Sequence, residues 1–166
     1  MGADDQRPWW TRAVLDTSVL ISAHRHWLWL LARKGYYQGI WSAFIVGELV
    51  RVRTEHSIKH GVERAVYRQR INDLIHLFSD VLTIVDYRRV SSDAALKDPD
   101  DEPIHATAVA ADAGCLISLN TSDFPPDAVL DGIRYVTPQE FLGALAAAHE
   151  QVDLPALVDA AGKQVP

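Results

Sequence analysis

The sequence predicts a three-layer α/β fold, in which helices cover both faces of a mainly parallel central sheet. Short apolar runs of strand length alternate with longer stretches whose apolar residues recur at helical spacing. At 166 residues, with 48% hydrophobic and 23% charged residues, the chain suits one globular domain with a substantial core. We therefore expect a folded domain at 13–150, after a lead-in at 1–12 and before a tail at 151–166.

The order of the expected elements follows from this alternation and from the residues that punctuate it. Glycine often ends a helix, serine accepts hydrogen bonds from a helix start, and proline fits the first helical turn. In the first half the pattern indicates a strand at 13–15, a helix from Ser18 to a stop at Gly35, a strand at 39–41, a helix capped by Ser42, and one or two amphipathic helices at 57–80. In the second half it indicates a strand at 81–85, a short helix at 90–95, a helix at 106–113 that ends at Gly114, strands at 115–119 and 133–136, and a helix from Pro138 to Ala148.

Composition favours a cytoplasmic protein. The single cysteine, Cys115, has no partner for an internal disulfide, which fits a reducing compartment. Residues 1–11 carry Asp4 and Asp5 and lack the apolar segment of a secretory signal. The most apolar stretch near the start, 27–32, is too short to cross a bilayer, so we expect no membrane association.

Charge is unevenly distributed along the chain, whose net charge is −6. That sum argues against a nucleic-acid partner, because phosphate binding needs a basic surface. Residues 51–70, however, hold six basic side chains and two acidic ones, whereas residues 86–140 hold eleven acidic and four basic ones. A metal-dependent nuclease would divide its charge in this way, with an acidic pocket for cations beside a basic arm for the phosphate backbone.

The chain is organised around the carboxylates at 98–102, where four of five residues are acidic. Acidic residues are common at helix starts, where they compensate unpaired N–H groups, so this cluster alone is weak evidence of function. A further carboxylate, Asp16, ends the first expected strand. Ligands in parallel α/β sheets bind beyond the carboxyl ends of the strands, so Asp16 stands where active sites are built.

Glu48 is another acidic candidate. Its neighbours in the expected helix are Val46, Leu49, Val50 and Val52, which leave little polar surface around it. A carboxylate among apolar side chains needs a partner or a metal ion. Carboxylate ligands without paired cysteine or histidine favour Mg²⁺ or Mn²⁺ over zinc, so a pocket uniting these acids would be a magnesium or manganese site.

Five segments, in order along the chain, resemble the PIN-domain nucleases. They are 14–23 with Asp16, Ser42 with Gly47-Glu48-Leu49, Asp98-Pro99-Asp100-Asp101 followed by Ala106-Thr107-Ala108, Cys115 to Asn120 with Asp123-Phe124, and Thr137 to Leu142. The resemblance implies a PIN-like α/β fold and a metal-dependent endoribonuclease, similar to the VapC-like toxin of a bacterial toxin–antitoxin pair. It also implies an RNA substrate, a cognate antitoxin protein and a homodimer.

The resemblance assigns roles to the three acidic candidates. Asp16 and Asp101 would be direct metal ligands, while Glu48 would face Asp16 across the site and orient water or a second ion. Asp101 is preferred over Asp98 and Asp100 because its spacing from the alanine-rich helix matches the family. Asp98 is the substitute if that register is shifted.

The fourth acidic position departs from the family pattern. The strand at 115–119 ends on Asn120 rather than on an aspartate. We therefore expect Asp123 to serve as the fourth catalytic carboxylate, while Asn120 orients water or substrate. Metal affinity would then be weaker than with a full acidic set.

Three further side chains stand near the expected ligands. Thr17 and Ser18 follow Asp16, and their hydroxyls either contact phosphate or water at the site or cap the helix that starts there. His105 lies one turn into the helix after the acidic cluster, where a packed histidine is more common than a ligand, so we expect at most a supporting role. Basic residues expected to contact RNA backbone are Arg51, Arg53, Lys59 and Arg64.

Two other functions remain open from the sequence. A phosphatase with an aspartyl nucleophile also begins with a strand ending in aspartate, but it normally carries a second aspartate two residues later, where this chain has Ser18. A catalytically weak or inactive RNA-binding or regulatory module would accommodate the departure at Asn120. Measurements of RNA cleavage and RNA binding separate these readings from the nuclease.

Overall fold

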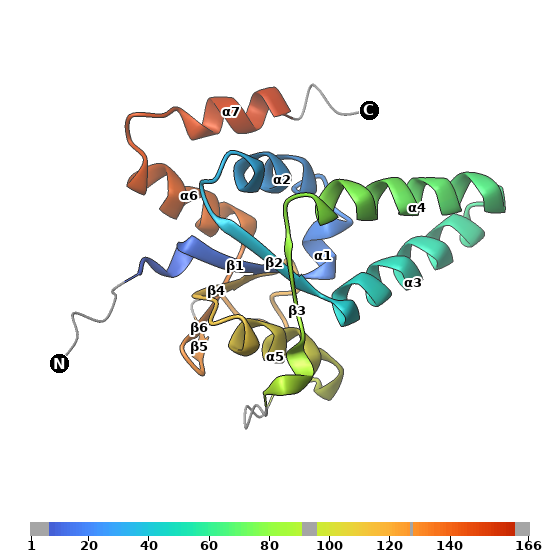
Figure 1. Ribbon diagram of the computed structural model, residues 1–166, viewed down its shortest axis with the longest axis horizontal. Helices are drawn as coiled ribbons and strands as arrows, with labels where there is room; N and C mark the ends of the chain where they lie inside the picture. The colour runs from blue at the N-terminus through green and yellow to red at the C-terminus, as the bar shows by residue number, and fades with distance from the viewer. Residues whose placement is uncertain (1–6, 91–95, 127, 162–166) are drawn as a thin grey trace.

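The computed structural model describes residues 7–90, 96–126 and 128–161, and it confirms the expected α/β fold (Figure 1). Within these residues one six-stranded sheet has the order β3-β2-β1-β4-β6-β5. Its strands are β1 (Arg12–Leu15), β2 (Gln38–Ser42), β3 (Thr83–Val85), β4 (Cys115–Ile117), β5 (Val129–Leu130) and β6 (Ile133–Val136). Neighbouring strands run parallel except β5, which pairs antiparallel with β6, so the sheet is mainly parallel as predicted.

Helices flank this sheet on both sides. The α-helices are α1 (Thr17–Leu20), α2 (Arg25–Arg33), α3 (Ala43–Lys59), α4 (Arg64–Ser79), α5 (Glu102–Ala110), α6 (Pro138–Ala148) and α7 (Leu154–Ala161). Short 3₁₀ turns are η1 (Trp9–Thr11), η2 (Tyr87–Arg89) and η3 (Pro99–Asp101). In Figure 1, α2 and α7 lie on one side of the sheet, α5 lies on the other, and α3 and α4 form a hairpin that projects from the domain. In the described residues, helices that are both long and apolar enough to cross a membrane are absent.

The central strands β1 and β4 are continuous apolar runs because both of their faces are buried. Val14 in β1 and Leu116 in β4 are fully buried, because helices cover both faces of these neighbouring strands. β1 pairs with β2 on one side and with β4 on the other. Because the order of strands along the chain reverses at β1, its carboxyl end opens into the crevice where parallel sheets bind ligands.

The predicted helix boundaries are confirmed where punctuating residues set them. Gly35 follows α2 with a φ of +79°, the left-handed conformation expected of a helix stop. The Ser42 side chain accepts a hydrogen bond from the Ile45 N–H at the start of α3. Thr137 caps α6 in a reciprocal pair with Glu140, just before Pro138.

The single helix predicted from Ser18 to Gly35 is wrong, because the structure divides it into α1 and α2. The Ser22 hydroxyl donates to the Val19 carbonyl at 2.8 Å and accepts from the His24 N–H at 3.1 Å. Such local side-chain bonds compete with helical ones and interrupt the helix.

The boundary between the next two helices also differs from prediction. α3 continues to Lys59, beyond the expected division at residue 57, and the chain turns at Gly61 with a φ of +65°. Residues 54–59 contain neither glycine nor proline, so the helix extends until Gly61 permits the turn. The basic residues Arg51, Arg53 and Lys59 therefore belong to α3.

The predicted helix end at Gly114 is wrong as well. α5 ends at Ala110, and Asp112 adopts the left-handed conformation with a φ of 49°. Gly114 serves close packing instead, because a Cβ at this position would lie 2.1 Å from the Trp9 carbonyl oxygen.

The segment expected as a tail at 151–166 contains a further helix. Residues 154–161 form α7, which contacts α2 and α6, and Leu154 is fully buried. Its apolar residues, spaced helically, complete the covering of the domain. The short helix expected at 90–95 lies mostly outside the described residues, which stop at Val90 and resume at Leu96.

Candidate active site

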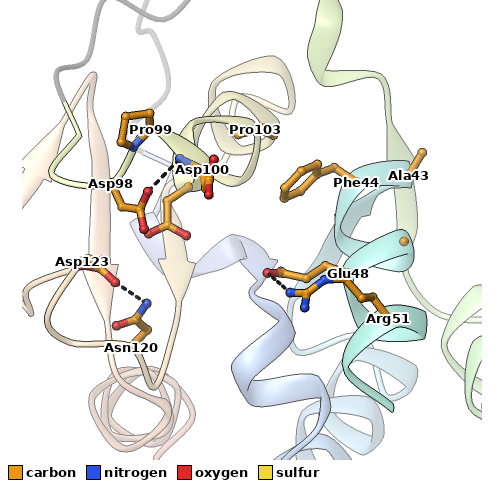
Figure 2. Close-up of a pocket in the computed structure, with 12 residues that line it drawn as sticks. Ala43, Phe44, Glu48, Arg51, Asp98, Pro99, Asp100, Pro103, Asn120 and Asp123 are labelled. Carbon is orange, nitrogen blue, oxygen red and sulfur yellow. Dashed lines mark hydrogen bonds and ion pairs between the residues drawn. The ribbon is translucent and has the colours of Figure 1, made fainter. Parts of the chain in front are cut away.

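The expected acidic residues gather beyond the carboxyl ends of three adjacent strands. Asp16 follows β1, Glu48 lies on the helix that follows β2, and Asp123 lies in the loop that follows β4. η3 and α5 add the cluster at 98–101, because α5 packs against β1 and β2. A cleft of about 870 Å³ opens between these elements (Figure 2) and is lined by Ala43, Phe44, Gly47, Glu48, Arg51, Asp98, Pro99, Asp100, Asp101, Pro103, Asn120 and Asp123.

Asp16 is held by two serine hydroxyls. Its side chain is buried, and its Oδ2 accepts hydrogen bonds from Ser18 Oγ and Ser118 Oγ, each at 2.6 Å. The Leu119 N–H donates in turn to Ser18 Oγ at 3.0 Å. Ser18 therefore does not cap α1; it fixes the carboxylate at the end of β1.

Glu48 is positioned in the same way from α3. Its Oε2 accepts a 2.6 Å hydrogen bond from Thr17 Oγ1, while its Oε1 lies 3.8 Å from an Nη atom of Arg51. Figure 2 shows Glu48 on one side of the cleft and Asp98 and Asp123 on the other. Because Thr17 follows Asp16 in the chain, one short turn holds both carboxylates.

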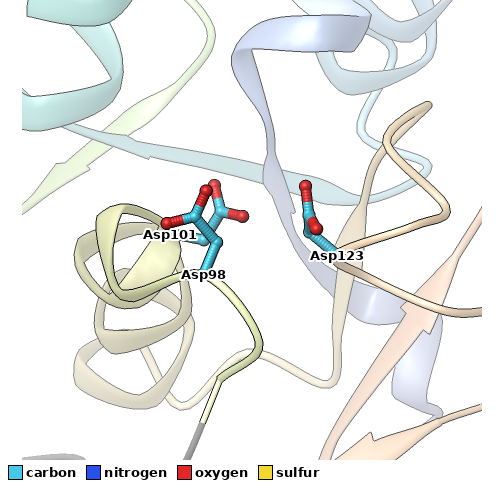
Figure 3. A group of neighbouring side chains, drawn as sticks. All are labelled: Asp98, Asp101 and Asp123. Carbon is cyan, nitrogen blue, oxygen red and sulfur yellow. The ribbon is translucent and has the colours of Figure 1, made fainter.

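Asp98, Asp101 and Asp123 form a close acidic group (Figure 3). One carboxylate oxygen from each can be chosen so that all three atoms lie within 4.8 Å of one another. Asp98 Oδ1 also accepts from the Asp100 N–H at 2.9 Å, which fixes the start of η3. The structure thus brings Asp98, which the sequence ranked behind Asp101, close to both Asp101 and Asp123.

Asn120 acts on Asp123. Its Nδ2 donates to Asp123 Oδ2 at 2.7 Å, and its Oδ1 accepts from Ser122 Oγ at 2.9 Å. Lys97 Nζ lies 3.8 Å from Asp123 Oδ1. The asparagine that departs from the family pattern therefore orients the neighbouring carboxylate.

The pKa of Asp101 reflects both its burial and the charges of four other carboxylates. Burial raises the pKa of Asp101 to about 6, with further contributions from the negative charges of Asp123, Asp16, Asp98 and Glu48, in that order. Its Oδ2 is buried, and no donor among the described residues bonds to it. A bound cation would offset the cost of burying this carboxylate beside four like charges.

These residues fit a divalent metal ion. The donor set consists of carboxylate oxygens, which are the ligands that Mg²⁺ and Mn²⁺ prefer. The unbonded oxygen of Asp101 is available to such an ion. Asp98, Asp101 and Asp123 are close enough together to share it.

Asp101→Asn is expected to stabilise the metal-free protein at pH 7.5, by on the order of 1–2 kcal/mol, because the substitution removes this repulsion. Since the folded-state pKa is about 6, above the ordinary value of 3.8, the penalty is complete well above pH 6. It shrinks as the pH falls from 6 toward 3.8, because the folded protein takes up a proton before the unfolded chain does, and it is lost below that range. Urea unfolding in EDTA should show the full gain at pH 7.5 and a gain about a third as large at pH 4.5.

Asp100→Asn is the control for this stability measurement, because it changes the adjacent, exposed carboxylate. It should alter the free energy of unfolding by less than about 0.5 kcal/mol. A metal-free Asp101→Asn protein less stable than wild type at pH 7.5 would contradict the electrostatic account.

His105 is fully buried and has both ring nitrogens engaged. Nε2 lies 2.9 Å from Asp131 Oδ2, and Nδ1 lies 2.9 Å from the Tyr135 hydroxyl. Neither nitrogen is free to bind a metal ion, so any influence of His105 on the site passes through its packing in α5.

The four basic residues expected to contact RNA differ in their surroundings. Arg51 lines the cleft and pairs with Glu48 and Glu55. Arg53 is partly buried, whereas Lys59 and Arg64 are exposed on the hairpin of α3 and α4. The structure therefore sets only Arg51 on the rim of the acidic cleft.

Sequence reasoning missed Ser118 and Phe44. Ser118 follows β4 as Asp16 follows β1, so the rule that strand ends carry site residues could have identified it. Phe44 lines the cleft from the first turn of α3, with its ring centroid 6.1 Å from that of Tyr87. Phe44 forms part of the cleft wall through tertiary packing, which no local sequence pattern predicts.

Comparisons with known proteins identify the family of the chain. The model of the PIN domain matches residues 12–122 of the chain. Among solved structures, the chain is similar to one in the crystal structure of VapBC2 from Rickettsia felis bound to a DNA fragment from their promoter, with 14% identity and a TM-score of 0.49 over 76% of this chain and 98% of that one. A search of curated protein sequences finds no match. Because the matched region spans most of the chain and contains the strands that carry the acidic site, the chain belongs to the PIN-domain family.

Proposed function

We propose that this protein is a metal-dependent endoribonuclease that hydrolyses RNA phosphodiester bonds. The observation that carries the proposal is the approach of Asp98, Asp101 and Asp123 to within 4.8 Å of one another at the ligand end of the sheet. Membership of the PIN-domain family, whose known members include nucleases, supports the same reading.

The proposed metal site unites the residues expected from the sequence with those gathered by the fold. Asp16, Glu48 and Asp101 remain the expected ligands, and Asp98 and Asp123 join them by proximity and charge. A bound Mg²⁺ or Mn²⁺ would supply an acidified water to attack phosphorus and positive charge to stabilise the leaving oxygen.

The side chains around the site would hold these carboxylates in place. Ser18 and Ser118 fix Asp16, and Asn120 fixes Asp123, each through a hydrogen bond of 2.7 Å or less. Such supporting bonds orient ligands and raise the affinity of a site. The hydrogen bond that Asn120 donates to Asp123 supports an active site rather than an inactive one. Although asparagine departs from the family pattern at this position, it still orients a carboxylate.

The biological setting is proposed from the family resemblance. The protein would be a cytoplasmic toxin that acts as a homodimer and is neutralised by a cognate antitoxin protein. Four basic residues of α3 and α4 would contact the RNA backbone, with Arg51 on the rim of the acidic cleft and Arg53, Lys59 and Arg64 farther along the two helices.

RNA cleavage by the purified protein tests the proposed activity. Labelled single-stranded RNA should be cut in Mn²⁺, remain intact in EDTA, and remain intact with Asp16→Asn. RNA binding that is equal in all three cases, without cleavage, would favour the non-catalytic module. Hydrolysis of a small phosphomonoester with the RNA left intact would favour the phosphatase.

A further inference from the structure

A second groove adjoins the acidic cleft. It has a volume of about 850 Å³, and its lining includes Phe44, Val85, Tyr87, Arg88 and Arg89. Ala43 and Phe44 line both cavities, so the two hollows meet at the start of α3. Figure 2 shows the ring of Phe44 pointing from α3 into the acidic cleft. We call the second hollow the η2 groove, because η2 (Tyr87–Arg89) contributes to its wall.

The helix α5 places the η2 groove beside the carboxylates. It packs against η2, η3 and α3. Asp101, the last residue of η3, immediately precedes α5 and lines the acidic cleft, whereas Ala110 at the end of α5 lines the η2 groove. Because α5 has nine residues, it is about 13.5 Å long. A strand of a few nucleotides can therefore occupy both hollows at once.

Two aromatic rings stand in this second hollow. The ring centroids of Phe44 and Tyr87 lie 6.1 Å apart in an edge-to-face arrangement. Both residues are partly exposed, and both line the groove. Bases of single-stranded nucleic acid stack on aromatic side chains placed along a basic groove.

The η2 groove carries the charge that the acidic cleft lacks. Arg88 is held by Asp86, to which its Nε donates at 2.9 Å and its Nη2 at 3.2 Å. Arg89 has only a 3.8 Å contact with the same carboxylate, and its side chain is 84% exposed. One carboxylate thus faces two guanidinium groups, which leaves Arg89 able to bind a phosphate. The acidic cleft, by contrast, is lined by five carboxylates and one arginine.

We propose that the η2 groove binds one nucleotide of a single-stranded RNA, with its base stacked on Tyr87 and Phe44 and its phosphate on Arg89. The inference rests on the proposed function and adds a substrate subsite to it. Arginine forms charge-assisted hydrogen bonds with phosphate oxygens, and aromatic rings accept any base. Asp86 holds Arg88 and does not contact the RNA. The bound nucleotide would keep the strand in place while the carboxylates act on a neighbouring phosphodiester bond.

The first test measures stacking at Tyr87. The affinity for a labelled oligouridylate is measured in EDTA and compared with that for a strand of the same length that lacks bases. Tyr87→Ala should weaken oligouridylate binding at least about 5-fold, since stacking is worth at least about 1 kcal/mol per base, and should leave binding of the baseless strand unchanged. Tyr87→Phe keeps the ring and should bind both strands within about twofold of wild type. An unchanged affinity of Tyr87→Ala for oligouridylate, or an equal loss on both strands, would overturn the subsite.

The second test measures the phosphate contact at Arg89. Arg89→Gln should lower the slope of log K against log salt by about 0.7, the value for one phosphate contact on a single strand. Because Arg89 is exposed, this variant should fold, and it carries the test if circular dichroism shows that Tyr87→Ala does not. A slope equal to that of wild type would overturn the assignment.

Tyr67→Ala/Arg70→Gln is the matched control for Tyr87→Ala/Arg89→Gln. Tyr67 is partly buried and Arg70 is exposed, and both lie on α4 rather than in the lining of either cavity. The control should leave the RNA affinity and the salt slope unchanged. Equal losses in the two double variants would show that surface composition rather than the η2 groove governs binding, and would overturn the proposal.

Cleavage of the same RNA in Mn²⁺ separates this inference from the proposed function. Wild-type cleavage together with unaltered RNA binding by Tyr87→Ala/Arg89→Gln overturns the subsite and leaves the nuclease. RNA binding that needs Tyr87 and Arg89, without cleavage by wild type, supports the subsite and overturns the nuclease. If the double variant keeps its RNA affinity but loses binding to polyglutamate, the groove serves an acidic protein partner and the RNA proposal is overturned.

Discussion

Replacing Asp101 with asparagine is expected to slow RNA cleavage at least about 1,000-fold. Burial raises the pKa of Asp101, and the negative charges of the other four acids raise it further. Asparagine keeps the shape but removes the charge that would hold a divalent ion. Metal ions contribute several kcal/mol to phosphodiester cleavage, and each 1.36 kcal/mol is about a tenfold change in rate. The measurement is single-turnover cleavage of labelled RNA in saturating Mn²⁺.

Asp100→Asn serves again as the matched control. Asp100 is an exposed neighbour that lines the same cleft but lies outside the close group of Asp98, Asp101 and Asp123. Its replacement should change the cleavage rate by less than about threefold. If the two variants lose activity equally, general negative charge rather than a defined site governs cleavage, and the assignment of Asp101 fails.

Asp16→Asn is expected to reduce cleavage at least about 100-fold while the protein stays folded. The asparagine Oδ1 can accept the hydrogen bonds that Ser18 and Ser118 now give to Asp16 Oδ2, so the turn after β1 should persist. The lost charge would weaken metal binding at the ligand end of the sheet. Cleavage rate, measured together with the thermal unfolding midpoint, separates loss of chemistry from loss of fold.

Asp86 offers a comparison on the same sheet. It directly follows β3 as Asp16 follows β1, but β3 is an edge strand and Asp86 bonds Arg88 there. Asp86→Asn should leave cleavage within about threefold of wild type. A loss with Asp86→Asn as large as that with Asp16→Asn would show that strand-end charge, and not the position at the centre of the sheet, is what matters.

Much of the fold could be predicted because its signals are local. Ser42 and Pro138 mark helix starts and Gly35 marks a helix end, and the structure uses each of them as expected. The apolar runs that form β1 and β4 are buried on both faces, so they read clearly as strands. The helix at 154–161 escaped prediction because its pattern is short and its stability comes from packing on α2 and α6.

The candidate site was predictable in part for the same reason. Asp16 and Glu48 could be singled out because a strand end and an apolar helix surround them. Which of the acids at 98–102 would approach Asp123 depends on the turn fixed by the bond from the Asp100 N–H to Asp98, which the sequence does not display. The engagement of His105 by Asp131 joins residues 26 positions apart, and only the folded chain brings them together.

A crystal soaked in Mn²⁺ and measured for anomalous scattering tests most directly whether these acids form one metal centre. The account predicts a peak about 2.0–2.4 Å from an oxygen of Asp101 and from an oxygen of at least one of Asp98, Asp123 and Asp16. The peak should be absent from Asp101→Asn and present in Asp100→Asn. Manganese bound elsewhere, or no manganese in a protein that still cuts RNA, would contradict the account.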